Sequence, residues 1–336
     1  MASDKFRLVT RSDFDGLACA VLLKEIGMVE DILFVHPKDM QDGKIEIGER
    51  DITTNLPYVA TAHLVFDHHQ SEMIRNTGSR KNHVIDPRAA SAARVVYDYF
   101  GGKSRFSNVS DEMMAAVDKA DSAQYDLDDI LAPKDWTLLN YLMDARTGLG
   151  RFKNFRISNY QLMMALIDCC RTMSIQQILE LPDVKERCDL YMSHRSLAGE
   201  QIERCSRVYG NVVVLDLRNE ETIYATNRFL IYAMFPLCNL SIHQLWGLNK
   251  QNTVLAIGKS ILDRSSKTTV GELCLRFGGG GHQAAGTCQV ENSWAERALA
   301  ELIESIHDDE KEQRPHAASG NPATINVVGP SIASER

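Results

Sequence analysis

Two short strings of this sequence contain residues that could bind ligands or take part in catalysis. Residues 66–72 read FDHHQSE and continue an apolar run, while residues 278–286 read GGGGHQAAG. A carboxylate beside imidazoles at the end of a buried strand can bind a divalent metal ion. A run of glycines lets backbone N–H groups surround a phosphate. Together the two strings predict a metal-dependent enzyme that cleaves phosphate esters or anhydrides.

Further carboxylates extend the first candidate site. Asp13 and Asp15 follow a predicted strand at residues 6–10, and their spacing of two points both side chains the same way in an extended chain. Asp67 and His68 follow another predicted strand. In a parallel sheet these strand ends can be neighbours, which would create a hard-cation site. The alternative is that Asp13 caps a helix and Asp15 is solvated.

Two more aspartates depend on the fold for any such role. Asp51 lies between the second and third predicted strands, and Asp121 lies at the end of a predicted helix. Taken alone, each is better explained as a cap or turn residue. They become metal ligands only if the fold brings them to the other carboxylates.

The glycine string predicts an anion-binding loop rather than a Walker A loop, because no Lys-Ser/Thr pair follows it. His282 can add a hydrogen bond or a positive charge. Lys259 and Arg264 lie upstream and could reach the same anion. A flexible loop and a solvated charged face are the alternatives.

A basic segment, residues 146–156 (RTGLGRFKNFR), combines four cations with two phenylalanines. Cations interleaved with aromatic rings are typical of nucleotide binding. A basic loop that connects helices is the slightly preferred interpretation.

The arrangement of apolar segments predicts an α/β fold. The N-terminal part alternates strands and helices, which indicates a mostly parallel sheet flanked by helices. A helical insert and a long connecting helix at residues 183–206 follow, and then a smaller α/β part. We therefore expect a catalytic domain over residues 1–207, a substrate-binding domain over 208–307 and a disordered tail over 308–336.

Bulk composition narrows the class of protein. The net charge of -8 over 336 residues argues against a surface that coats DNA. We find neither an apolar run of 18 residues nor a signal-peptide core, so we expect no membrane partner. Eight scattered cysteines fit reduced thiols, and we expect a cytoplasmic protein.

In this order, the strings resemble the DHH phosphoesterase superfamily with its DHH-associated C-terminal domain, over residues 5–306. That superfamily includes exopolyphosphatases, pyrophosphatases, single-strand exonucleases, nanoRNases, 3′-phosphoadenosine phosphatases and cyclic-dinucleotide phosphodiesterases. The resemblance implies an active-site cleft between the two domains and two divalent ions. Mn²⁺ is the expected ion, with Mg²⁺ or Co²⁺ as alternatives.

The resemblance also assigns roles. Asp51 and Asp121 would be bridging or shared metal ligands, His68 would bind one ion, and His69 would orient or contact the phosphate. The implied metal ligands are Asp13, Asp15, Asp51, Asp67, His68 and Asp121, and the implied catalytic residues are Asp13, Asp15, Asp67, His68 and His69. The implied substrate-binding residues are Arg11, His69, Lys259, Arg264, Gly279, Gly280, Gly281 and His282.

One feature departs from the family pattern. Many members have a histidine shortly before the first aspartate pair, whereas this chain has Arg11 in that stretch. A guanidinium cannot ligate a metal. Either one ion is held more weakly, or Arg11 binds phosphate instead.

The resulting functional prediction is hydrolysis of small nucleotides: short oligoribonucleotides, dinucleotides or 3′,5′-bisphosphates. An exopolyphosphatase or pyrophosphatase is the first alternative, and a non-catalytic nucleotide sensor is the second. The expected partner is a small phosphate-containing substrate, with short single-stranded nucleic acid and a homodimer as further options.

Overall fold

The computed structural model describes residues 5–69 and 80–311. Residues 70–72 of the first string and most of the predicted tail lie outside this part. Residues 308–311 belong to the last helix, which therefore extends slightly past the predicted start of the tail.

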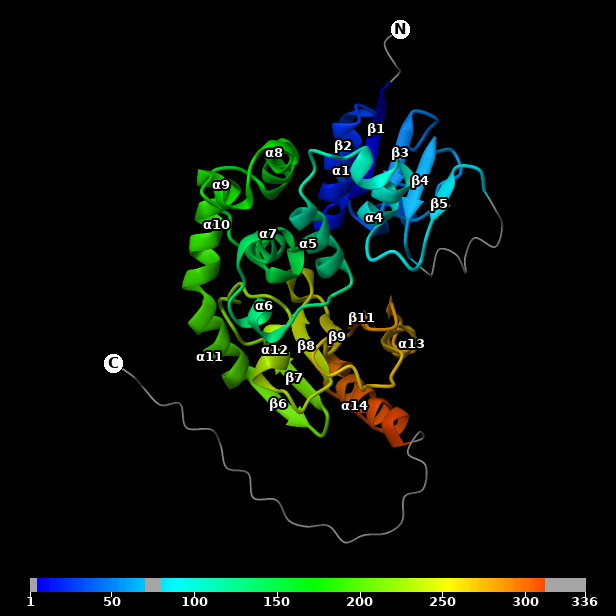
Figure 1. The fold of residues 1–336 in the computed structure, drawn as a ribbon. Helices are drawn as coiled ribbons and strands as arrows, with labels where there is room; N and C mark the ends of the chain where they lie inside the picture. The colour runs from blue at the N-terminus through cyan, green and yellow to red at the C-terminus, as the bar shows by residue number, and fades with distance from the viewer. Residues whose placement is uncertain (1–4, 70–79, 312–336) are drawn as a thin grey trace.

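The first sheet is parallel and has the strand order β2-β1-β3-β4-β5 (Figure 1). Both of its faces are covered, because Leu8 and Val9 on the inner strand β1 belong to different apolar clusters. The predicted α/β class is thereby confirmed. The strands are β1 (Phe6–Arg11), β2 (Val29–Val35), β3 (Asp51–Thr54), β4 (Leu64–Asp67) and β5 (His83–Ile85).

Strand β3 has no counterpart among the predicted strands. Its sequence, Asp-Ile-Thr-Thr, is rich in β-branched residues, and all four residues are buried. It pairs in parallel with β1 on one side and with β4 on the other. The C-terminal ends of β1, β3 and β4 therefore lie side by side, at the edge where ligands bind in open α/β sheets.

Three helices pack together over one face of this sheet. Gly16 lets helix α1 approach the end of β1, since a Cβ at this position would overlap the carbonyl oxygen of Arg11. The helix begins at an Asp13 cap, and the next helix, α4, begins at a Ser91 cap. These helices are α1 (Phe14–Glu25), α4 (Ala92–Tyr99) and α5 (Asp111–Asp121), while the short α2 (Pro37–Gln41) lies beyond β2.

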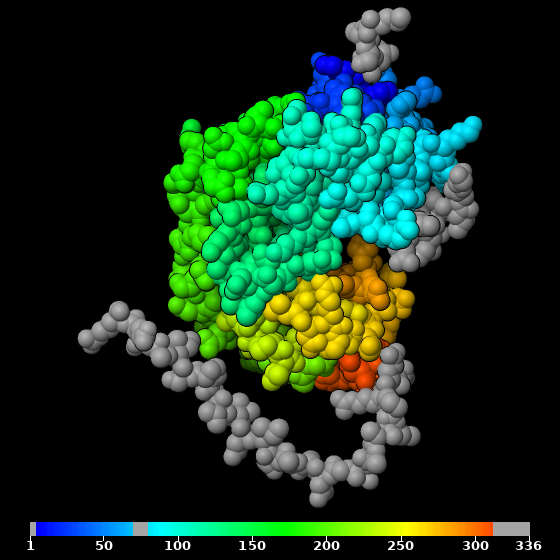
Figure 2. All heavy atoms as spheres, viewed as in Figure 1, coloured from blue at the N-terminus to red at the C-terminus, as the bar shows by residue number. Residues whose placement is uncertain are grey.

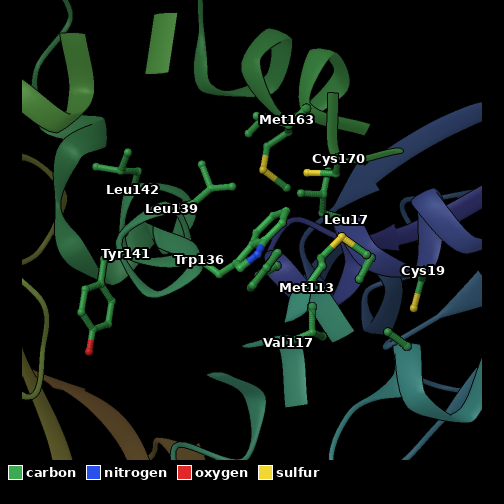
Figure 3. Packing of buried hydrophobic residues seen from close by; sticks show 14 of the residues in the cluster. Leu17, Cys19, Met113, Val117, Trp136, Leu139, Tyr141, Leu142, Met163 and Cys170 are labelled. Carbon is green, nitrogen blue, oxygen red and sulfur yellow. The ribbon is translucent and has the colours of Figure 1, made fainter. Parts of the chain in front are cut away.

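The helical insert shares its core with the first sheet. Trp136 and Leu139 of α7 pack among Leu17 of α1, Met113 of α5 and Met163 of α8 (Figure 3). The predicted long helix is divided at His194 into α10 and α11. The insert comprises α6 (Leu127–Leu131), α7 (Asp135–Met143), α8 (Asn159–Thr172), α9 (Ile175–Leu179), α10 (Pro182–Ser193) and α11 (Arg195–Cys205).

The second sheet is mixed, with the order β10-β11-β9-β8-β7-β6. One face is covered by α13 and α14, while Leu215 and Ile231 join the core of the insert on the other side. The sheet starts at Ser206, slightly before the predicted boundary. Its elements are β6 (Ser206–Tyr209), β7 (Val212–Asp216), α12 (Leu230–Met234), β8 (Leu240–Trp246), β9 (Thr253–Lys259), α13 (Val270–Leu275), β10 (Gly280–Gly281), β11 (Ala285–Val290) and α14 (Ala295–Lys311).

The two sheets face each other across a hollow. Figure 2 shows this hollow between the cyan part of the chain, near β5 and α4, and the yellow and orange part, near β11 and α13. Within the described residues, no helix has the length and apolar character needed to cross a membrane.

Candidate active site

A carboxylate and imidazole cluster lies at the C-terminal edge of the first sheet. Asp15 comes from the start of α1, His68 from the residue after β4, and Asp121 from the end of α5. One ligand atom from each lies within 4.8 Å of the others. Two carboxylate oxygens and an imidazole nitrogen are a donor set that suits Mn²⁺, Mg²⁺ or Zn²⁺.

The ring of His68 is oriented as a metal ligand requires. Nδ1 lies 3.1 Å from the carbonyl oxygen of Ala89, to which it can donate its proton. Nε2 lies 2.9 Å from a carboxylate oxygen of Asp121 and is shielded from solvent, but the pair lacks hydrogen-bond geometry. A carbonyl behind one ring nitrogen commonly fixes the other for metal binding. The residues present therefore fit a divalent ion.

Electrostatics also favour a cation here. Burial raises the pKa of Asp15, and the charges of Asp121 and Asp13 raise it further. Burial alone would lower the pKa of His68, but Asp121 and Asp15 raise it to about 9. Partly desolvated carboxylates at this distance repel one another unless positive charge is added. A divalent ion would supply that charge and displace the His68 proton.

Asp13 lies beside the cluster but is engaged elsewhere. Its Oδ1 accepts a hydrogen bond of 2.9 Å from the N–H of Gly16, as expected of a helix cap. Its Oδ2 lies 2.8 Å from Nε of Arg11. Arg11 thus pairs with Asp13, whereas Asp15, the other carboxylate of the first acidic pair, belongs to the cluster.

Asp67 positions the two histidines that follow it. Its buried carboxylate accepts hydrogen bonds from the backbone N–H of His68 at 2.8 Å and from Nδ1 of His69 at 2.7 Å. The His69 ring lies 6.0 Å from the ring of His282, which belongs to the glycine string. His69 and His282 thus join the first sheet to the second at the site.

Asp51 is not at the site, and its predicted metal role is wrong. It begins β3, so it lies at the N-terminal edge of the sheet, opposite the cluster. Its carboxylate is bound by Nε of Arg7 at 2.7 Å and by the N–H of Gly48 at 2.7 Å. Although burial acts to raise the pKa of Asp51, these hydrogen bonds lower it. The carboxylate serves the fold.

Asn55 is the site residue that the sequence analysis missed. It follows the C-terminal end of β3 in a left-handed conformation, with φ of 55°, and is buried. Its Nδ2 lies 3.3 Å from Oδ1 of Asp13, while its Oδ1 has no hydrogen-bond partner in the described chain. Prediction of a strand over residues 51–54 would have placed Asn55 at the active edge.

Replacing Asp51 with asparagine tests this reassignment. We expect the free energy of unfolding to fall by about 1–3 kcal/mol, because the charge-assisted hydrogen bonds from Arg7 are weakened. Urea unfolding measures this effect. Asp31→Asn removes an exposed charge near the same arginine and should change little. Metal content and turnover of folded Asp51→Asn should match the wild type, and loss of bound metal would restore the original assignment.

The glycine string forms a tight hairpin between β10 and β11. A Cβ at Gly279 would overlap the carbonyl oxygen of Thr287, and one at Gly281 would overlap that of Ala285. The N–H groups of Gly279 and His282 donate to the carbonyl oxygens of Cys274 and Ala285. Two N–H groups of the predicted phosphate-binding nest are therefore engaged within the protein, one by helix α13 and one within the hairpin. Gly280 instead faces open space.

A cavity of about 560 Å³ opens between the helical insert and the second sheet. Its volume lies within the range of small-molecule sites. Its wall includes Ala123, two residues after Asp121, part of the glycine hairpin, and Arg146, which acts electrostatically on Asp13 and Asp121, so the cavity lies near the cluster. Its cations are Arg146, Arg151, Arg228 and Lys259, and its apolar wall includes Leu215, Ile231 and Tyr232.

Of the two other predicted substrate-binding cations, one lines this cavity and the other makes a structural contact. Lys259 lines the cavity, where its Nζ also donates to the carbonyl oxygen of Ser266 at 3.1 Å. Arg264 donates to the carbonyl oxygen of Ala123 at 2.8 Å and joins the second sheet to the end of α5. Arg264 therefore makes a contact between parts of the chain and does not line the cavity.

The basic segment at residues 146–156 contains residues that pack within the fold and residues that line the cavity. Phe152 packs against the ring of His194 at 4.8 Å, and Phe155 lies under the guanidinium of Arg187 at 4.2 Å. Both phenylalanines are used within the fold, as the connecting-loop interpretation expects. Arg146 and Arg151 from the same segment line the cavity.

Comparison with solved structures identifies relatives that share this architecture. The pGpG-specific phosphodiesterase PggH from Vibrio cholerae is 62% identical, with a TM-score of 0.80, over 91% of this chain and 100% of that chain. An exopolyphosphatase-related protein from Bacteroides fragilis (13% identity, TM-score 0.52) covers 91% of this chain and 94% of its own. RecJ from Thermus thermophilus in complex with Mn²⁺ is 11% identical with a TM-score of 0.50, over 90% of this chain and 52% of that chain.

The two distant structures support the fold alone, whereas the first supports the family. No family model and no curated protein matched the chain. The identity of 62% applies to an alignment over 91% of this chain and the whole of that chain. The predicted family and the predicted class of enzyme, a phosphoric ester hydrolase, are confirmed. This chain belongs to the DHH phosphoesterase superfamily.

Proposed function

We propose that this chain is a metal-dependent phosphodiesterase that hydrolyses short linear dinucleotides of the pGpG type. The observation that carries the proposal is the position of the Asp15, His68 and Asp121 cluster beside a cation-lined cavity with apolar walls. The identity of 62% to a pGpG-specific phosphodiesterase supports the same substrate class.

Asp15, His68 and Asp121 would hold the first divalent ion. When bound, the ion would polarise a phosphoryl oxygen and lower the pKa of a water molecule, which is the chemistry that such ions supply in hydrolases. Mn²⁺ is the ion we expect, with Mg²⁺ or Co²⁺ as alternatives. A second ion would require Asp13 to leave Arg11, so we expect it to bind more weakly.

The remaining residues would orient and neutralise the phosphate. Asp67 accepts the Nδ1 hydrogen bond of His69, which leaves Nε2 as the ring nitrogen that can reach the substrate. Arg146 acts electrostatically on both Asp13 and Asp121, and its side chain is 52% exposed. A guanidinium in this position can stabilise negative charge on phosphoryl oxygens.

The cavity favours a nucleotide over an inorganic polyphosphate. Leu215, Ile231 and Tyr232 form an apolar wall that a polyphosphate chain has no group to contact. A nucleoside can bury its base against such a wall, and the surrounding cations can bind its phosphates. The non-catalytic sensor alternative has no need of the three converging ligands.

Initial rates with Mn²⁺ across a panel of substrates test the proposal. The panel contains pGpG, cyclic di-GMP, a longer oligoribonucleotide, polyphosphate and pyrophosphate. We expect kcat/KM for pGpG to exceed that for polyphosphate and pyrophosphate by at least about 100-fold, since only the nucleotide uses the apolar wall. Equal or faster turnover of the inorganic substrates would replace this proposal with the polyphosphatase alternative.

A further inference from the structure

Arg228 is a cation in the cavity wall without a counter-ion. Its Nε is shielded from solvent and has no hydrogen-bond partner in the described residues. Within that same part of the chain, no carboxylate lies within ion-pair distance of its guanidinium. Arg228 is half-buried, and a guanidinium that lines a cavity without a counter-ion is suited to an anionic ligand.

The segment that carries Arg228 is firmly held. Asn227 is buried, and its Nδ2 donates to the carbonyl oxygen of Ile130 at 3.0 Å and to the hydroxyl of Tyr191 at 3.2 Å. Phe229 is buried and donates its backbone N–H to Oδ1 of Asn227 at 3.1 Å. The Arg228 guanidinium lies over the Phe229 ring at 4.4 Å. The backbone on both sides of Arg228 is thus fixed, and the Phe229 ring supports the guanidinium on one face.

The surroundings of Arg228 carry excess positive charge. Arg146 also lines the cavity and binds the carboxylate of Asp144 at 2.7 Å. Asp144 is a carboxylate that acts on Arg228, and it is already paired with Arg146. Burial and the repulsion from Arg146 lower the pKa of Arg228 to about 10. A dianionic phosphate would relieve this repulsion, whereas a neutral base edge would not.

Arg228 and Arg146 line the same cavity, and Arg228 is not one of the metal-binding cluster. Arg146 interacts electrostatically with Asp13 and Asp121, while the main charges that act on Arg228 are those of Arg146 and Asp144. Its other neighbour, Tyr232, is buried against Ser241 of the second sheet. A ligand that places one phosphate at the cluster and extends into this cavity would therefore meet Arg228 with a second group.

On the basis of the phosphodiesterase function proposed above, we propose that Arg228 binds the terminal 5′-phosphate of a linear dinucleotide. The internal phosphodiester lies at the cluster, and the 5′ nucleoside occupies the cavity. The enzyme then distinguishes pGpG from the dinucleoside monophosphate GpG, which has the same scissile bond but no terminal phosphate. Arg228 determines specificity and takes no part in bond cleavage.

Steady-state kinetics on pGpG and GpG test this role. We expect the wild type to prefer pGpG by about 10- to 100-fold in kcat/KM, the scale of a charge-assisted contact with phosphate. Arg228→Gln should lose this preference through a higher KM for pGpG and leave GpG unchanged, and Arg228→Lys should retain part of it. Arg297→Gln, which removes an exposed cation on α14, should keep the full preference.

Three results would overturn the inference. The wild type could hydrolyse pGpG and GpG with equal kcat/KM, which would show that the 5′-phosphate is not recognised. Arg228→Gln could slow both substrates by the same factor, which indicates a structural role. Arg228→Gln could instead change the preference for pGpG over pApA while it keeps the preference for pGpG over GpG. That result would indicate that Arg228 recognises the base.

A binding measurement separates this inference from the proposed function. If the wild type hydrolyses neither dinucleotide, the phosphodiesterase proposal fails. Isothermal titration with guanosine 5′-monophosphate and guanosine then tests Arg228 alone. Tighter binding of the monophosphate that Arg228→Gln abolishes supports the phosphate site, and equal binding of both ligands by the wild type rejects it.

Discussion

Replacing His68 with alanine is expected to reduce kcat/KM for a dinucleotide by about 1,000-fold or more, while the protein remains folded. His68 supplies the one imidazole nitrogen of the cluster, and its Nε2 faces Asp121 at 2.9 Å. Without that nitrogen, the two remaining carboxylates would hold a divalent ion more weakly. Turnover with Mn²⁺ and the content of bound metal, measured on the same sample, report the effect.

The matched control is His63→Ala. His63 precedes β4 as His68 follows it, so the two histidines lie at opposite ends of one strand. His63 is exposed and stacks on Phe6, with ring centroids 4.2 Å apart. We expect this variant to keep its metal and its rate. If His68→Ala also kept both, the cluster would not be the metal site.

Replacing Gly279 with alanine is expected to destabilise the second sheet by about 2–4 kcal/mol, in the range of overpacked core positions. The added Cβ would overlap the backbone of Thr287 and lie 2.7 Å from the Cβ of Cys288, which is fully buried. Neither neighbour can move without disrupting the pairing of β11 with β9. Thermal unfolding should show Tm lowered by roughly 5–10 °C.

Gly280→Ala is the matched control, one residue along the same string. An added Cβ at Gly280 meets nothing within 4 Å, so we expect Tm to be unchanged. Gly280 lines the cavity, and any effect should therefore be a higher KM for the dinucleotide. Equal stability of the two variants would mean that the glycine string does not form the tight hairpin described here.

The sequence predicted the fold well where apolar periodicity was strong. The alternation of strands and helices before residue 100 indicated a parallel sheet, and β1, β2, β4 and β5 all lie where apolar runs occur. Strand β3 is only four residues long and begins with an aspartate, so its pattern is too short to stand out. The error at Asp51 follows directly. Whether a residue lies at the N-terminal or the C-terminal edge of the sheet depends on where its strand begins and ends.

The site was predicted in part, for similar reasons. Asp15 and His68 were predictable because each follows the C-terminal end of an apolar strand of a parallel sheet, and Asp121 joins them at the end of α5. The competing role of Asp13 as a cap of α1, with Arg11 as its partner, depends on side-chain geometry. Arg228 carries no motif at all, since it belongs to a segment whose partners, Ile130 and Tyr191, are distant in sequence. Long-range contacts of this kind leave no local pattern.

The most direct test of the central claim is the metal dependence of pGpG cleavage, followed by chromatography of the products. Hydrolysis of one phosphodiester by one water molecule converts pGpG into two molecules of guanosine 5′-monophosphate. We predict this conversion with Mn²⁺, its loss after chelation and its recovery when Mn²⁺ is restored. Intact pGpG in the presence of metal-loaded protein, or equal cleavage after chelation, would contradict the assignment of the cluster as a metal-dependent phosphodiesterase site.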